Sequence, residues 1–550
     1  MRARLTWALI TAAFLTCAAP AAASDPADQP PFGGEEIPPL VVRDVSVRQP
    51  PPRYRLSAAE AIAIARRADE VGEEGEQEPL RAGVGTRGRN WEITFRDQDG
   101  TARALVVIND GSAEVLEAWT GYQVETRLAR GYPGAVAGIV NAVWIWLPLC
   151  LLFIAPFFDW RRPLRLLHLD LLALLAFSVS LYFFNRGEIG VSVPLVYPVL
   201  GYLLGRLLVV GSRPQRSRQR LVPVADPALL VAGIVGLVAL HVVVALAEAK
   251  VIDVGLASVI GADRLADGEF VYGAGSASGQ PIRVDVYGPA NYLAYLPFEQ
   301  LFPWSGSWDS VPAARVASLA FDLLTALGLF VLGRRLRPWP EGRLLGAALA
   351  FAWLAYPFSL YALGSSFNDG LLALLVVGCL IVLSSAPARG AFAGLAGLTK
   401  FGPLALAPLL AAGRGERSPR TLALFAFAFV LAAAAAVGLV IGGSSLSEFY
   451  DRSLGYQATR GSPFSAWGQA PSLDPLQTAL QVGAVAFGLA LYFWPRRREP
   501  AQVAALAGAA LIAVQLPATH WFYPYCLWFA PAALVAFFAA YRGERAHVRA

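Results

Sequence analysis

The stretch VADPALLVAGIVGLVALHVVVALA, residues 224–247, contains a single charged side chain, that of Asp226. An apolar run of about 20 residues is long enough to cross the hydrocarbon core of a bilayer as a helix. The whole chain is 56% hydrophobic and 15% charged, which is unlike a soluble globular protein. We therefore predict a polytopic α-helical membrane protein with about 11 spans, a re-entrant segment and a small α+β outer domain. The other apolar runs are, approximately, 134–157, 166–184, 189–210, 311–332, 344–363, 370–385, 390–412, 421–441, 476–494, 501–517 and 522–540.

Short arginine clusters separate these runs, and they predict the sidedness of the chain. The long loop 249–310 is instead predominantly acidic. Because basic loops are retained in the cytoplasm, we place the arginine clusters and the C-terminus there, and the acidic loop outside a bacterial cytoplasmic membrane. The net charge of +5 arises from these clusters and does not predict nucleic-acid binding. The clusters are 161–165, 213–220, 334–337, 414–420, 496–498 and 541–545.

The N-terminal region predicts export. Residues 1–23 begin with arginines, continue as LTWALITAAFLT and end in small residues, which is typical of a secretory signal peptide. An uncleaved anchor is the alternative, and it would also export the residues after it. In residues 24–133, Ser57-Ala-Ala-Glu60 is a capping box that opens a helix, and WEITFRD, ARALVVIND and SAEVLEAWTG are typical of strands. A helix followed by an antiparallel hairpin resembles a PepSY domain, a small binding or regulatory module.

The run GLAGLTKFGPLALAPLL, residues 394–410, contains one of only two lysines in the chain. A charge at hydrocarbon depth costs roughly 3 kcal/mol and is a hypothesis of a functional site. Both neighbours of the run 390–412 begin or end at predicted cytoplasmic arginines, so the run must leave that side and return to it. Its length is too short for two spans. We predict two short re-entrant arms broken near Lys400-Phe-Gly-Pro403; a miscounted span elsewhere is the alternative.

Several motifs occur in the order found in one enzyme family. The first outer loop has Asp253, a G-x-x-x-L-x-x-G-x-x-x-Y pattern ending at Tyr272, and a Y-x-P segment at Tyr287. With the later motifs, the chain resembles GT-C glycosyltransferases over roughly 224–540, in particular polyprenol-phosphate-mannose-dependent mannosyltransferases. That family has Tyr-Pro-Pro where this chain has Tyr287-Gly288-Pro289. The later motifs are AARVASLAFDLLTALGLFVLGRRL (313–336), SSFNDG (365–370), GLAGLTKFGPLALAPLL (394–410) and THWFYPYCLWFAPAAL (519–534).

The resemblance implies catalytic roles for two residues. Sugar transfer requires a base for the acceptor hydroxyl, and a partly buried carboxylate at the membrane boundary suits that role. Asp253 is the candidate, a solvated loop acid being the alternative, and Asp285 is held in reserve. His520 aligns with a late histidine motif, which implies a role at the donor phosphate or in proton transfer. Anchoring in an aromatic belt is the alternative for His520.

Cations and polar groups must also hold the donor. Lys400, Arg315 and Arg460 are the candidates for the phosphate, and Tyr287, Asn291 and Asp285 complete the predicted substrate site. Arg315 and Asp322 are seven residues apart and share a helix face, so mutual structural compensation is an equal alternative for this pair. A solvated arginine is the alternative for Arg460.

No cofactor and no metal site are predicted, because no cluster has metal-ligand spacing and the cysteines lie in separate apolar runs. No glycine-rich phosphate loop is present, which argues against a nucleotide-sugar donor. We expect transfer of a sugar, with mannose as one candidate, from a polyprenyl-phosphate donor to a glycolipid, glycan or protein acceptor. Residues 221–541 would form the catalytic domain among membrane lipids, and 134–220 would add further helices. The alternative is a non-enzymatic transporter or lipid-handling protein with a PepSY-like sensing domain.

Overall fold

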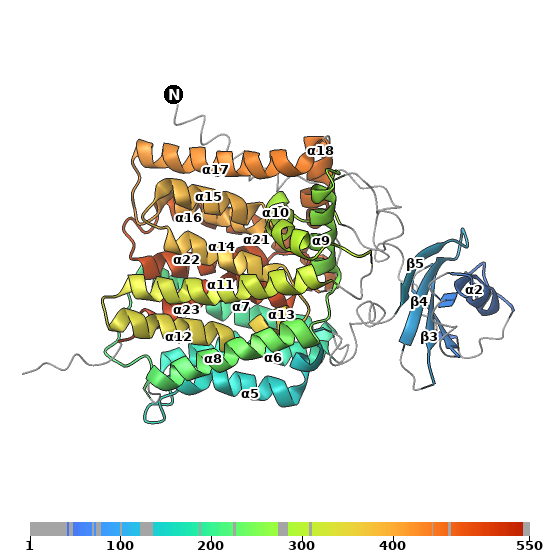
Figure 1. The fold of residues 1–550 in the computed structure, drawn as a ribbon, viewed down its shortest axis with the longest axis horizontal. Helices are drawn as coiled ribbons and strands as arrows, with labels where there is room; N and C mark the ends of the chain where they lie inside the picture. The colour runs from blue at the N-terminus through green and yellow to red at the C-terminus, as the bar shows by residue number, and fades with distance from the viewer. Residues whose placement is uncertain are drawn as a thin grey trace, which may run out of the picture.

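A computed structural model describes residues 41–42, 48–68, 71–72, 79–87, 89–98, 102–120, 136–185, 189–223, 227–272, 284–306, 311–442, 444–459 and 464–542. The described chain forms a small sheet with one helix, and a bundle of long helices that run side by side (Figure 1). In this view the sheet lies beyond the end of the bundle at which α9 (Asp253–Ala266) and α10 (Pro289–Leu301) are found. The predicted signal peptide lies outside the described residues.

The sheet is an antiparallel meander whose strands are ordered as in the chain, β1-β2-β3-β4-β5. Helix α2 (Ala58–Ala65) begins at the predicted capping box, in which Ser57 and Glu60 bond each other's backbone. Its alanine face packs on inward side chains such as Trp91 and Val106, so this unit has its own core. The predicted helix and three predicted strands are confirmed; of the two further strands, β1 precedes the helix and β2 lies between the helix and the predicted strands. The strands are β1 (Val41–Val42), β2 (Arg81–Arg87), β3 (Asn90–Arg96), β4 (Ala102–Asn109) and β5 (Val115–Thr120).

Every apolar run predicted from the sequence contains helix. The main bundle helices are α5 (Val143–Ile154), α6 (Leu166–Phe184), α7 (Ile189–Ser212), α8 (Pro227–Val243), α11 (Pro312–Leu336), α12 (Glu341–Ala355), α13 (Pro357–Leu363), α14 (Asp369–Ile381), α15 (Ala386–Gly397), α16 (Ala407–Ala412), α17 (Pro419–Ile441), α21 (Asp474–Phe493), α22 (Pro500–Gln515) and α23 (Cys526–Phe538). Shorter elements are α18 (Leu446–Phe449), a π-helical segment (Tyr450–Gly455), α19 (Tyr456–Thr459) and α20 (Ala466–Gln469).

The described residues contain six helices long and apolar enough to cross a membrane, or seven if α12 and α13 are taken as one span bent by 56°. The predicted number of about 11 spans is therefore not confirmed. Breaks in the predicted runs account for the difference. Pro357 follows the bend between α12 and α13, and α14 has only 13 residues, which corresponds to about 20 Å of helix.

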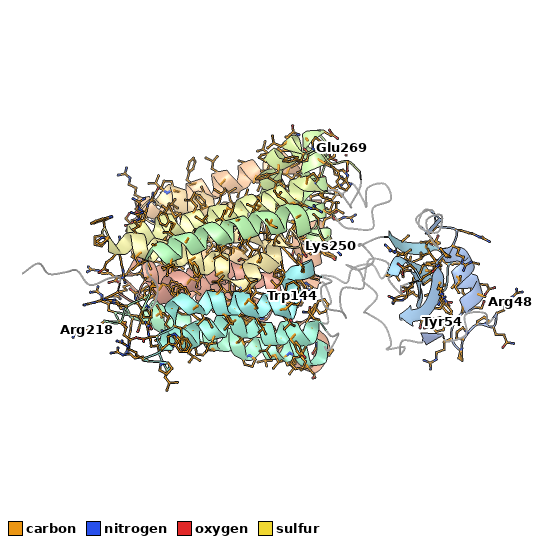
Figure 2. The ribbon with its side chains drawn as sticks, turned by 60° about the horizontal axis from the view of Figure 1, so that its bottom comes forward. Arg48, Tyr54, Trp144, Arg218, Lys250 and Glu269 are labelled. Atoms are coloured by element: carbon orange, nitrogen blue, oxygen red, sulfur yellow. The ribbon has the colours of Figure 1, made fainter. Side chains whose placement is uncertain are left out.

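The arginine clusters meet at one end of the bundle, as their predicted common side requires. Arg165 donates to the carbonyl of Arg220, and Arg216 forms a 2.9 Å ion pair with Glu499. Arg337 donates to the carbonyl of Ala539, the residue just after α23. Figure 2 shows Arg218 at this end, and Lys250 and Glu269 at the opposite end, nearer the sheet.

The run around Lys400 forms the predicted helical hairpin. Helix α15 ends at Gly397, the chain turns through residues 398–401, and a short 3₁₀-helix (Gly402–Leu406) leads into α16. Two observations show that the chain reverses. Gly397 packs against the side chain of Leu404 just across the turn, and Arg389 near the start of α15 donates to the carbonyl of Leu410 in α16 at 2.8 Å.

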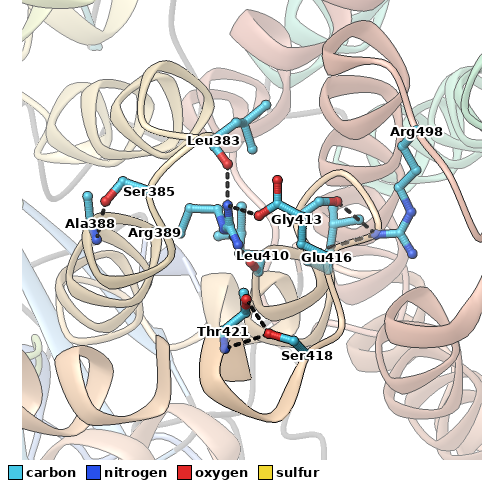
Figure 3. A network of polar contacts seen from close by, with 11 residues as sticks. Leu383, Ser385, Ala388, Arg389, Leu410, Gly413, Glu416, Ser418, Thr421 and Arg498 are labelled. Carbon is cyan, nitrogen blue, oxygen red and sulfur yellow. Dashed lines mark hydrogen bonds and ion pairs between the residues drawn. The ribbon is translucent and has the colours of Figure 1, made fainter. Parts of the chain in front are cut away.

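Two buried arginines close the base of this hairpin (Figure 3). Arg389 also bonds the carbonyl of Leu383, which ties the loop before α15 to the end of α16. Arg498 donates to the carbonyl of Pro495, in the segment between α21 and α22, and to the carbonyl of Gly413, just after α16. Leu410 and Gly413 lie at the C-terminal end of α16, where a helix leaves backbone carbonyls without partners in the helix, and the two guanidinium groups donate to these carbonyls. The hairpin base is thereby fixed at the arginine-rich end.

Candidate functional site

The tip of the hairpin lies at the opposite end, where it meets the start of α10. The Gly288 N–H donates to the Thr399 carbonyl at 3.3 Å, and the Ala290 N–H donates to the Leu398 carbonyl at 3.0 Å. A Cβ atom at Gly288 would overlap the Leu398 carbonyl. A proline at this position could not donate the first bond. The Tyr-Gly-Pro sequence of this chain thus allows the loop before α10 to dock on the turn that carries Lys400.

Lys400 is held by one carboxylate and surrounded by aromatic rings. Its Nζ lies 2.6 Å from Oδ1 of Asp369. The same nitrogen lies 5.8 Å, 5.4 Å and 5.6 Å from the ring centroids of Tyr287, Tyr525 and Trp528, distances at which a cation is attracted to a ring face. The Lys400 side chain is 12% exposed and the Asp369 side chain 1%. The ammonium is therefore the more accessible member of the pair.

Asp369 was not among the residues predicted from the sequence. It is the first residue of α14, where the partial positive charge of a helix N-terminus stabilises a carboxylate. Its Oδ1 also accepts a hydrogen bond from Nε1 of Trp528 at 2.6 Å. A signal was present, because Asp369 lies in the SSFNDG turn at the very edge of an apolar run. Its partners are 31 and 159 residues away, and no local pattern indicates them.

Asp253, the predicted base, lies near this group. It is the first residue of α9, and its Oδ1 accepts the N–H of Val254 at 2.9 Å. Its carboxylate lies within electrostatic range of the Lys400 ammonium and of the Tyr287 phenol, so the structure places these three predicted residues in one region. The expectation of partial burial is wrong, because the Asp253 side chain is exposed. The two residues just before it, Val251 and Ile252, are the buried ones.

Asn291 is held inside the bundle by two side-chain hydrogen bonds. Its side chain is fully buried, and its amide nitrogen donates to Oγ of Ser258 at 2.9 Å. Its amide oxygen accepts from Nδ2 of Asn368 at 2.9 Å. The prediction that Asn291 contacts substrate is not supported, since both ends of the amide are used within the protein. This chain of bonds connects α9, which carries Asp253, to the residue before Asp369.

His520 lies beside the aromatic residues that surround Lys400. Its ring centroid is 6.2 Å from that of Tyr525, edge to face, and 5.6 Å from that of Phe464. The side chain is half-buried in the segment between α22 and α23. Tyr525 contacts both His520 and Lys400, so the fold places these two predicted residues on the same aromatic ring.

Two acidic residues considered in the sequence analysis, Asp322 and Asp285, have other partners. Asp322 does not compensate Arg315; it bonds Nδ1 of His241 at 2.7 Å and Nε1 of Trp353 at 2.9 Å. The alternative of an Arg315–Asp322 pair is therefore wrong, because α8 and α12 supply the partners of Asp322. Asp285 is buried, with Nε of Arg452 at 3.9 Å. Arg460 lies outside the described residues.

Asp263 of α9 is partly buried. Burial and, next, the negative charge of Glu299 raise the pKa of Asp263 to about 6. Across the described part of the chain, no three His, Cys, Asp or Glu side chains are grouped so as to hold a metal ion. We therefore assign no metal role to this carboxylate pair.

Comparison with known proteins agrees with a membrane transferase. Residues 286–546 match the model of Glycosyltransferase family 87, a family of GT-C-like membrane glycosyltransferases. The matched region includes Tyr287, Asp369, Lys400, His520 and Trp528, and it begins after Asp253. A search of curated proteins found no match. The family match supports glycosyl transfer in a membrane; it does not identify the donor, the sugar or the acceptor.

Proposed function

We propose that this protein transfers a sugar, mannose being the first candidate, from a polyprenyl-phosphate donor to an acceptor on the outer face of a bacterial cytoplasmic membrane. One observation carries the proposal. A lysine ammonium, the tip of a helical hairpin and a candidate base meet at the end of the bundle where α9 and α10 begin. A lipid-linked donor would present its phosphate at this depth, with the sugar toward the aqueous side.

The reaction needs a base and a group that stabilises the departing phosphate. Asp253 accepts the proton of the acceptor hydroxyl while the hydroxyl oxygen forms a bond to the anomeric carbon of the sugar. The bond between that carbon and the phosphate oxygen breaks, and the electron pair leaves with the lipid phosphate. Lys400 stabilises the negative charge that develops on the phosphate. The acceptor, by covering the exposed Asp253, would exclude water from the carboxylate during transfer.

The surroundings of Lys400 suit a phosphate that carries an apolar chain. An ammonium has three N–H donors, and Asp369 accepts one of them. The rings of Tyr287, Tyr525 and Trp528 surround the ammonium with apolar surface, where an ionic hydrogen bond is stronger than in water. His520 is placed to contact the same phosphate or to carry a proton near it.

The proposal also covers topology. The arginine-rich end is cytoplasmic, and the sheet with α2 is a PepSY-like module outside the membrane. The packing of α2 on the inward side chains of the antiparallel strands supports a binding or regulatory module.

The test uses the full-length protein in liposomes together with membranes as acceptor. Radiolabelled polyprenyl-phosphate mannose and polyprenyl-phosphate glucose are compared with the matching nucleotide sugars. Label should pass from one lipid donor to an acceptor, with release of polyprenyl phosphate, and an Asp253→Asn protein should be the matched inactive control. Transfer from a nucleotide sugar, or no transfer from any lipid-linked sugar tested, would overturn the proposal.

A further inference from the structure

The Asp369 carboxylate is fixed from three directions. Its backbone begins α14, its Oδ1 accepts from both Lys400 and Trp528 at 2.6 Å, and its side chain is only 1% exposed. Asn368, just before it, is bonded to Asn291 of α10. The other carboxylate oxygen, Oδ2, is buried without a hydrogen-bond partner. Nothing in this arrangement lets the carboxylate itself reach a substrate.

The side chain of Lys400, in contrast, can rotate, and its direction must be fixed by its partners. A lysine side chain is a point charge on a flexible stem of four carbons, so its direction is set by its partners. Among the described residues, Asp369 is the carboxylate bonded to this ammonium. The three rings around Nζ attract the charge but give it little direction, because a ring face accepts a cation over a broad area.

We propose that Asp369, held by Trp528, is a positioning residue that directs two N–H groups of Lys400 toward the phosphate of the lipid donor. This inference rests on the proposed function, since it assigns a partner to the cation of that same site. Asp369 has no contact with the reacting atoms. Its effect on donor binding passes through Lys400 and disappears when Lys400 is absent.

A purely structural ion pair would have different properties, and the chain offers one for comparison. Asp170 of α6 is fully buried, 3.0 Å from Nε of Arg206 and 2.8 Å from the hydroxyl of Tyr202. Like Asp369, it accepts from one cation and one neutral donor. Unlike the Lys400 ammonium, Arg206 of α7 lies outside the group of residues that includes Asp253, Tyr287 and Lys400. Asp170→Asn is therefore a matched control for the loss of a buried carboxylate.

The experiment measures binding of polyprenyl phosphate, without a sugar, to the full-length protein in detergent. Asp369→Asn and Lys400→Met should each weaken binding about 10- to 100-fold, the usual effect of losing one hydrogen bond to a charged group. The double variant should bind no more weakly than Lys400→Met alone. Asp369→Glu should recover part of the affinity, and Asp170→Asn should bind like wild type even if its thermal midpoint falls.

The outcomes separate the two proposals. If the wild type does not bind polyprenyl phosphate, the proposed function fails. If the wild type binds and the Asp369→Asn variant binds equally well, the positioning role alone is overturned. The same conclusion follows if the Asp369→Asn substitution weakens binding as much in the Lys400→Met background as in the wild type. Should Asp369→Asn fail to fold, Trp528→Phe decides, because it removes the indole N–H and keeps an aromatic ring. That variant should weaken binding several-fold, and wild-type affinity would contradict the inference.

Discussion

Replacing Asp253 with asparagine tests the proposed base with little disturbance of the fold. The side chain is exposed, and in its one described hydrogen bond Oδ1 accepts from the N–H of Val254. An asparagine oxygen can accept the same bond. The substitution therefore keeps the shape of the side chain and removes its basicity.

The expected effects on rate and on stability differ in size. General-base catalysis typically contributes 10²–10⁴-fold, so the barrier to transfer should rise by about 3–5 kcal/mol. Stability should change by less than about 1 kcal/mol, since only the interaction of the carboxylate with the N-terminus of α9 is lost. Donor binding should stay near its wild-type value, because Asp253 acts on the acceptor hydroxyl.

The assay is single-turnover transfer from a radiolabelled polyprenyl-phosphate sugar, with donor affinity and thermal midpoint measured on the same preparations. Asp267→Asn is the control, since Asp267 is an exposed carboxylate at the end of the same helix. Its rate should be close to that of the wild type. If Asp253→Asn also has a near-normal rate while Asp285→Asn is inactive, then Asp285 is the base and our choice of carboxylate is wrong.

The site and the topology give three further predictions. His520→Ala should lower turnover about 10- to 100-fold, as expected for loss of one hydrogen bond to a charged group, without changing the amount of inserted protein; full activity would leave His520 an anchoring residue. The raised pKa of Asp263, about 6 against an ordinary value of 3.8, means that its ionisation lowers stability as pH rises from about 4 to about 6. Asp263→Asn should therefore raise the thermal midpoint at pH 7 and leave it unchanged below about pH 4; equal midpoints at pH 7 would show that Asp263 ionises freely in the folded protein. Protease added to intact spheroplasts should remove residues 25–133, and survival of this region until lysis would refute the proposed sidedness.

Local patterns were sufficient for the elements and for several of their relations. Apolar runs predicted helices because a chain segment surrounded by hydrocarbon needs about 20 apolar residues, a property that the local composition shows directly. The arginine clusters predicted that the basic loops share one end of the bundle, and the contact of Arg165 with Arg220 illustrates how those clusters meet. The break at Lys400 was visible because a short apolar run between two basic connections had to reverse. The number of spans was not visible in the sequence, since the bend before Pro357 depends on packing with neighbouring helices.

The composition of the site itself depended on tertiary structure. Local pattern was enough to indicate that an isolated lysine lies in a hairpin and that Asp253 and His520 flank membrane helices at the same end. It could not indicate that Asp369 is the partner of Lys400, that Trp528 fixes Asp369, or that Asp322 pairs with His241 and not with Arg315. The physical reason is that a buried charge is stabilised by whichever groups the packed helices bring within about 3 Å. Those groups come from residues 31 to 159 positions away, and their choice is made by helix packing across the whole bundle.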